Sequence, residues 1–159
     1  MQKITPFLWF DSQAEEAARF YVSTFDNSKI VNVSRYPAEG APRPAGSVMT
    51  VEFQLDGRDF IALNGGPNHP FTEAISLFVS CETQEEVDGL WEKLTADGGG
   101  EVACGWLTDK YGLSWQIIPT ALLKLMTDKD RAKAARVMQA MMKMKKIDIA
   151  KLQEAYDRA

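Results

Sequence analysis

The sequence predicts an α+β fold in which a βαβββ module occurs twice and is followed by helices. A strand-like segment followed by an amphipathic helix begins near residue 4 and again near residue 74. The two copies align at an offset of 70 residues, so that Ala14–Ala17 matches Gln84–Val87. After Pro119 the apolar pattern is helical. A repeated unit of this kind normally buries the apolar face of one copy against the other.

The first module opens with a strand and a helix. Ile4–Phe10 is rich in strand-forming residues and predicts a buried strand. Asp11 and Ser12 are favourable N-cap residues, and two glutamates in the next turn suit the positive end of a helix dipole. Apolar residues then recur at helical spacing, which predicts a helix over Ser12–Phe25.

Three more strands complete the first module. We expect them over Lys29–Tyr36, Val48–Leu55 and Phe60–Leu63. Asp56-Gly57 is a strong hairpin signal and joins the last two of these strands.

The second module repeats this order. A strand is expected over Ala74–Ser80, and Thr83 opens a helix that runs to about Ala96. Two further strands are expected over Glu101–Trp106 and Leu113–Ile118. Asp109 and Lys110 lie in the turn between these strands, where we expect both side chains to be solvated.

The chain beyond residue 119 is expected to be a helical appendage. We predict one domain over residues 1–159, with modules at 1–70 and 71–119 and a C-terminal helical segment at 120–159. An apolar, methionine-rich side of this segment is formed by Val137, Met138, Met141, Met142 and Met144. Because acidic residues are interspersed with its lysines, we expect this side to pack on the domain or across a dimer rather than on a membrane.

Composition and charge exclude several classes of protein. The formal net charge is −4, so the chain has no electrostatic reason to collect on nucleic acid or anionic membranes. No apolar run is long enough to cross a bilayer, and Met1-Gln2-Lys3 leads into a strand rather than a signal peptide. Cys81 and Cys104 are too few for a disulfide framework. We therefore expect a cytoplasmic protein with reduced cysteines.

Five ordered stretches resemble the PhnB-like family of the vicinal oxygen chelate superfamily, which includes glyoxalase I, bleomycin-resistance proteins and extradiol dioxygenases. They are ITPFLWFDSQAEEAARFY, ALNGGP, SLFVSCETQEEVDGLWEKL, CGWLTDKYGLSWQIIP and RVMQAMMKMKKIDIAKLQEAY. The resemblance implies a curved eight-stranded mixed sheet around a cleft, of the glyoxalase/bleomycin resistance type, and a homodimer.

The PhnB-like family is often labelled 3-demethylubiquinone-9 3-methyltransferase, and this label can be tested on the residues. A Rossmann-type methyltransferase would show a strand, a glycine-rich turn and then a helix. Asn64–Pro67 follows a strand but is followed by another strand, and Gly98–Gly100 comes after a helix. We therefore do not expect methyl transfer from S-adenosylmethionine.

The metal-binding positions of the superfamily carry poor ligands here. Metal-dependent members hold a divalent ion with His or Glu from the first and last strands of each module. The corresponding positions are Thr5 or Pro6, Ile75 or Ser76, Ile61–Leu63, and Gln116. His69 is the one histidine and lies in a loop. Since a site needs three or four converging donors, we expect no metal and no other cofactor.

The candidate binding residues are aromatic and neutral polar side chains in or beside strands. Ligand pockets usually combine apolar walls with a few placed polar groups. The candidates for lining a cleft are Trp9, Asn64, Ser76, Trp106, Trp115 and Gln116. Each has a structural alternative, in which the tryptophans form core and the amides bind backbone.

Three functional hypotheses remain open at this point. The first is a small-molecule binding protein, or an enzyme of unknown reaction, with a metal-free cleft. The second is a metal-dependent lyase, isomerase or dioxygenase that uses donors at other positions. The third is a dimeric interaction module without catalysis. The sequence does not identify a catalytic residue, a ligand or a reaction.

Overall fold

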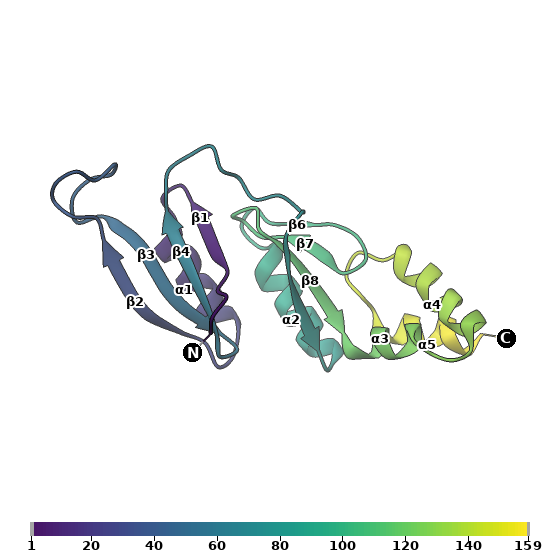
Figure 1. The fold of residues 1–159 in the computed structure, drawn as a ribbon. Helices are drawn as coiled ribbons and strands as arrows, with labels where there is room; N and C mark the ends of the chain where they lie inside the picture. Colours follow the sequence, from purple (N-terminus) through teal and green to yellow (C-terminus); the bar gives the residue numbers. More distant parts are fainter. Residues whose placement is uncertain (1, 159) are drawn as a thin grey trace. The chain divides into compact units, whose positions relative to one another are not determined.

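The computed structural model describes residues 2–158 and divides the chain into two compact units, Met1–Pro70 and Phe71–Ala159. Each unit contains one four-stranded mixed sheet with a helix against one face (Figure 1). The α+β class and the duplicated βαβββ module are therefore confirmed.

The first unit has its strands in the order β1-β4-β3-β2, with β1 parallel to β4 and the other pairs antiparallel. Its elements are β1 (Phe7–Phe10), α1 (Ala14–Thr24), β2 (Lys29–Arg35), β3 (Val48–Leu55) and β4 (Arg58–Asn64). Alternate side chains of the strands face α1 and form the core, as Leu8 and Phe10 do. On the helix, Ala17, Ala18 and Tyr21 are fully buried.

The second unit repeats the order as β5-β8-β7-β6, again with a parallel first pair. Its elements are β5 (Ser76–Cys81), α2 (Gln84–Thr95), β6 (Gly100–Glu101), β7 (Trp106–Thr108) and β8 (Ser114–Pro119). The helix α2 buries an apolar stripe that includes Val87 and Leu94. The helix packs on β8, where Trp115 and Ile117 are at most 2% exposed.

The two modules begin their helices differently. Thr83 caps α2 as expected, because its Oγ1 accepts a hydrogen bond from the N–H of Glu86 at 3.2 Å. The expected cap of α1 is wrong. That helix starts at Ala14, after Asp11 and Ser12, and neither of these side chains caps it.

The expected single strand over Glu101–Trp106 is also wrong. The strand is interrupted between β6 and β7, where Cys104 has φ 58° and Gly105 has φ 85°. Both values lie in the left-handed region, which a regular strand does not use. The chain therefore makes a turn before Trp106.

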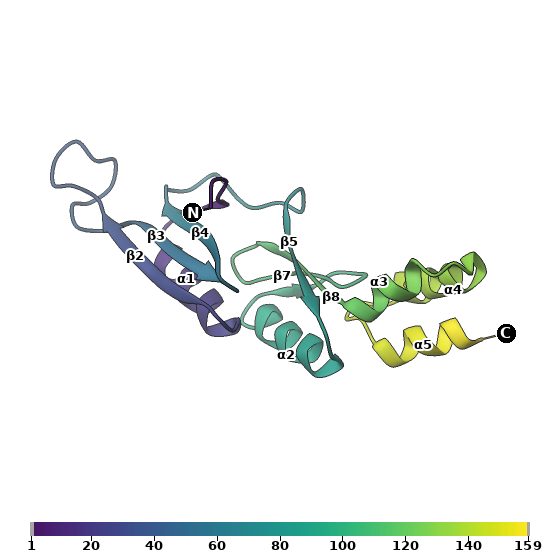
Figure 2. The same cartoon turned by 60° about the horizontal axis from the view of Figure 1, so that its bottom comes forward.

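The C-terminal segment forms three helices that pack together at one end of the second unit (Figure 2). They are α3 (Thr120–Met126), α4 (Arg131–Met142) and α5 (Ile149–Asp157). Their shared core is formed by Ile118, Leu122, Val137, Ile147 and Leu152. Met138 and Met142 of the methionine-rich side do not pack on the domain, since they are 46% and 64% exposed, and packing across a dimer stays a prediction for them. Within residues 2–158, no helix combines the length and apolar character needed to cross a membrane.

Candidate functional site

The sheet of the second unit presents one face to α2 and the opposite face away from it. Successive strand residues point to opposite faces, and residues paired across strands share a face. Gln116 pairs with Phe78 on β5 and with Trp106 on β7. Since Trp115 is buried under α2, Gln116 and its two partners lie on the face turned away from that helix. We call Ser76, Phe78, Trp106 and Gln116 the outer-face group.

A hydrogen bond joins two members of the outer-face group. The Nε2 of Gln116 donates to the Oγ of Ser76 at 2.9 Å. Both side chains are half-buried. Within residues 2–158 the Oε1 of Gln116 accepts no hydrogen bond, and the hydroxyl proton of Ser76 has no assigned acceptor. The pair can therefore offer a carbonyl acceptor and a hydroxyl donor to another molecule.

Trp106 differs from the other three tryptophans of the chain. Each of the others donates its Nε1–H to a protein oxygen: Trp9 to Gly66 O, Trp91 to Glu101 Oε2 and Trp115 to Asp109 Oδ2, at 2.8–2.9 Å. Among the described residues, the indole N–H of Trp106 has no such acceptor. Because an indole N–H usually finds a partner in protein, Trp106 carries a donor that is available to a ligand.

Trp115 lies on the other face of the same sheet. It is 2% exposed, and its Nε1 donates to the Oδ2 of Asp109 at 2.8 Å. The Oδ1 of Asp109 also accepts from the backbone N–H groups of Tyr111 and Leu113, at 2.8 and 3.1 Å. The expectation that Asp109 is solvated is therefore wrong, since this carboxylate is 2% exposed and organises the turn before β8.

Trp9 anchors a loop of the first unit. Its indole lies on Gly65, where an added Cβ would be 2.3 Å from the ring, and its Nε1 donates to Gly66 O. The ring of His69 lies beside it, with centroids 4.5 Å apart. The Trp9 indole is therefore already engaged with the loop that follows β4.

Asn64 is 7% exposed and uses its side chain within the first unit. Its Oδ1 accepts from the N–H of Ala14 at 2.7 Å, and its Nδ2 donates to Val48 O at 3.1 Å. The structure thus brings together Ser76, Trp106 and Gln116 of the six candidates. Trp115 lies on the opposite face of that sheet, and Trp9 and Asn64 belong to the first unit.

Charged side chains do not gather around the outer-face group in a way that suits a cation. In the described part of the chain, no three side chains of His, Cys, Asp or Glu converge on one point.

Cys81 lies at the end of β5, and its pKa is raised to about 12, first by burial and then by the charges of Glu86 and Glu82. The absence of a metal in the functional protein stays a prediction.

Phe78 is the member of the outer-face group that the sequence reasoning missed. It is 50% exposed. A signal for it was present, because Phe78 lies two residues after Ser76 and strand side chains alternate with a period of two.

Comparison with known proteins identifies relatives of this chain. A family model described as 3-demethylubiquinone-9 3-methyltransferase matches residues 2–118. A solved structure from Bacillus cereus, provisionally described as a 3-demethylubiquinone-9 3-methyltransferase and PhnB protein, is 44% identical. The match covers 74% of this chain and 99% of the Bacillus cereus chain, with a TM-score of 0.67. No curated protein matches the sequence.

More distant structures share the fold. A protein from Pseudomonas aeruginosa is 18% identical and has a TM-score of 0.57, with 75% of this chain and 98% of its own covered. The genomically encoded fosfomycin resistance protein of Listeria monocytogenes is 12% identical, with a TM-score of 0.50 and coverage of 75% and 93%. The family model ends before α3, so the three C-terminal helices lie outside it.

Proposed function

The chain belongs to the family described as 3-demethylubiquinone-9 3-methyltransferase, the PhnB-like proteins, and we propose that it binds a small organic molecule through its outer-face group. The observation that carries this proposal is the available indole N–H of Trp106. Trp106 on β7 is paired with Gln116 on β8, so the two side chains are neighbours on one face of the sheet. An available donor, a carbonyl acceptor and a hydroxyl then share one face of one sheet.

The chemistry of the group favours an uncharged ligand. Ser76, Trp106 and Gln116 supply only neutral polar groups, and Phe78 adds an exposed aromatic surface. A planar molecule with both a donor and an acceptor would use the flat surfaces and the hydrogen-bonding groups together. A ligand that depends on charge would find no matching side chain among these four.

We do not adopt the methyl transfer that the family's description names. In the described chain, both loops that lead from a strand to a following helix, residues 11–13 and 82–83, lack glycine. A Rossmann-type cofactor site uses glycines at that point so that backbone N–H groups approach phosphate or a related anion. The proposal is therefore one of binding, and it assigns no reaction.

The proposal extends to a metal-free site, a homodimer and a cytoplasmic location. A neutral amide at Gln116 is a weak ligand for a divalent ion, which supports a metal-free site. The exposed Leu123, Met138 and Met142 of α3 and α4 supply apolar surface for a second copy. The two free cysteines suit a reducing compartment.

The test is a thermal-shift screen with uncharged aromatic and heteroaromatic metabolites, run on protein dialysed against EDTA. A ligand at 100 times its dissociation constant adds about 2.7 kcal/mol to the free energy of unfolding. We expect hits on the wild type that weaken at least tenfold in Trp106→Phe and in Gln116→Ala. Gln153→Ala on the exposed side of α5 is the matched control and should bind normally.

Two results would contradict the proposal. Hits that bind Trp106→Phe and Gln116→Ala as tightly as the wild type would place the site elsewhere. Hits that appear only after Mg²⁺, Mn²⁺ or Zn²⁺ is added back would favour the metal-dependent alternative.

A further inference from the structure

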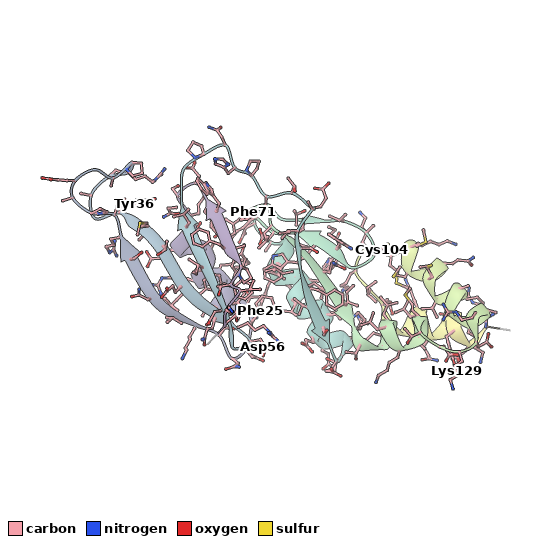
Figure 3. The ribbon with its side chains drawn as sticks, viewed as in Figure 1. Phe25, Tyr36, Asp56, Phe71, Cys104 and Lys129 are labelled. Carbon is pink, nitrogen blue, oxygen red and sulfur yellow. The ribbon has the colours of Figure 1, made fainter. Side chains whose placement is uncertain are left out.

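The segment between α4 and α5 runs beside the turn that precedes Trp106. The N–H of Cys104 donates to Met144 O at 2.9 Å, and the N–H of Gly105 donates to Lys145 O at 2.8 Å. Cys104 marks this turn in Figure 3. The carbonyl of Gly105 also accepts from the N–H of Ile117 at 2.8 Å. Gly105 is thus bonded on both sides, as a residue of an inner strand would be.

The same segment is also held by the start of α2. The Nε2 of Gln84 donates to Ile147 O at 3.0 Å, and the Oε1 of Gln84 accepts from the N–H of Ile149 at 2.8 Å. Lys146 Nζ lies 2.9 Å from Asp88 Oδ1. One glutamine side chain therefore bonds to a carbonyl and to an N–H of the segment, and its Nε2 also donates to Asp88 Oδ1 at 2.9 Å. We call residues 144–149 the strap.

Close contact fixes the strap against the turn. Ile147 is fully buried, and a Cβ added to Gly105 would lie 3.2 Å from its Cγ1 and 2.6 Å from the Cδ1 of Ile118. No side chain fits at Gly105, so the backbone of the turn and the strap share one tightly filled space.

Trp106 follows directly on this turn. Its N–H donates to Ala103 O and its carbonyl accepts from the N–H of Val102, both at 3.0 Å. Cys104 and Gly105 both have positive φ, so the turn has a particular shape that ordinary strand pairing does not enforce. Within residues 2–158, the N–H groups of Cys104 and Gly105 donate to carbonyls of the strap, and the one other backbone bond that leaves the turn joins Gly105 O to Ile117.

We propose that the strap is a positioning element for Trp106, so that a segment outside the family model sets the geometry of the outer-face group. Gln84 is the residue that locks the strap. The role of the strap in shaping a ligand site rests on the proposed function, whereas its hold on the turn and on the Trp106 ring does not.

The test compares the full-length wild type with Gln84→Ala, and it needs no ligand. Loss of two hydrogen bonds to the strap should speed hydrogen exchange at the amides of Cys104 and Gly105 roughly tenfold or more. The protein is also labelled with 5-fluorotryptophan, and its four ¹⁹F resonances are assigned by single Trp→Phe variants. We expect the Trp106 resonance to shift or broaden, while those of Trp9 and Trp115 stay unchanged.

Further variants separate positioning from a loss of stability. Gln84→Glu keeps the acceptor for Ile149 but loses the donor to Ile147 and to Asp88, and it places two carboxylates side by side, so its effects should be no smaller than those of Gln84→Ala. Lys146→Ala removes the ion pair with Asp88 and should act in the same direction but more weakly, which keeps the test decisive if Gln84→Ala does not fold. Gln153→Ala is the control and should change neither readout.

Two outcomes would overturn the inference. Unchanged exchange at Cys104 and Gly105 in the Gln84 variants would show that the strap does not hold the turn. Faster exchange with an unmoved Trp106 resonance would show that the turn does not position the ring. If instead both readouts respond but Trp106→Phe binds ligands normally, the proposed function is wrong, while the positioning of Trp106 by the strap is supported.

Discussion

The side chain of Asn64, at the end of β4, caps helix α1 through the backbone N–H of Ala14. The distance from Oδ1 to this nitrogen is 2.7 Å, and the two residues lie 50 positions apart in the chain. The amide Nδ2 donates to Val48 O at 3.1 Å. The carbonyl of Asn64 accepts from the hydroxyl of Tyr36 at 2.6 Å. One asparagine thus joins the helix, the start of β3 and the residue that follows β2.

Asn64→Ala should destabilise the protein by about 2 kcal/mol, because it removes a helix cap and leaves the carbonyl of Val48 without its donor. The measurement is urea unfolding followed by circular dichroism. Asn64→Asp keeps the acceptor for Ala14, so its stability should lie between those of the wild type and Asn64→Ala. Asn32→Ala on the exposed part of β2 is the matched control, and a loss there as large as at Asn64 would argue against the capping role.

The contrast between the two helix starts shows what the sequence could and could not predict. Thr83 lies next to the helix it caps, so a local pattern was enough to find it. The cap of α1 comes from another strand, and no local pattern reports a contact over 50 residues. The sequence therefore placed both helices correctly to within two residues but assigned the first cap to the wrong side chains.

The candidate site divides in a similar way. Trp115 and Gln116 are neighbours in one strand, so their side chains point to opposite faces. Both were predicted to line one cleft, although this alternation was enough to separate them. Strand alternation could not show that the indole N–H of Trp9 has a protein acceptor and that of Trp106 has none among the described residues. It depends on whether a distant acceptor meets the indole, and Gly66 does so only for Trp9.

Asp109→Asn should destabilise the second unit by about 1–3 kcal/mol. One oxygen of the buried carboxylate accepts from Tyr111 N and Leu113 N and the other accepts from Trp115 Nε1. Asparagine keeps one oxygen, and its Nδ2 cannot accept the bonds of the other. The fluorescence of Trp115 should change together with stability, since its indole loses or shifts its partner. Equilibrium unfolding in urea, with tryptophan fluorescence as the signal, measures both.

The control for that variant is Asp97→Asn, an exposed position with φ 55°. Asparagine tolerates the left-handed region well, so this substitution should leave stability within about 0.5 kcal/mol of the wild type. Equal stability of Asp109→Asn and Asp97→Asn would show that the buried carboxylate contributes nothing specific.

Alkaline pH should destabilise the protein through Cys81. Burial, followed by the charges of Glu86 and Glu82, raises the pKa of this thiol from 9.0 to about 12. The folded state therefore keeps the thiol protonated where the unfolded state would lose the proton. The stability linked to Cys81 is fully present below pH 9 and is lost as the pH rises toward 12.

Two measurements check the behaviour of Cys81. The fall in unfolding free energy between pH 8.5 and 10.5 should be smaller in Cys81→Ala than in the wild type, and Cys104→Ala should keep the full fall. Iodoacetamide at pH 8 should modify Cys104, which is only half-buried, well before Cys81. Faster labelling of Cys81 would contradict the raised pKa and the burial together.

Opposite effects are expected when alanine replaces two glycines of the second unit. At Gly105 the new Cβ would lie 2.6 Å from Ile118 Cδ1 and 3.1 Å from Ile117 O, and φ is +85°. Both the contact and the backbone conformation are unfavourable, so Gly105→Ala should lower the free energy of unfolding by about 2–4 kcal/mol.

Gly89 lies inside α2 with open space around the added Cβ. Gly89→Ala should therefore stabilise the protein by about 0.5–1 kcal/mol, because alanine loses less conformational freedom in a helix. Thermal and urea unfolding of the two variants measure both changes in stability. A Gly105→Ala protein as stable as the wild type would show that the turn before Trp106 can accommodate a Cβ, against the contacts described.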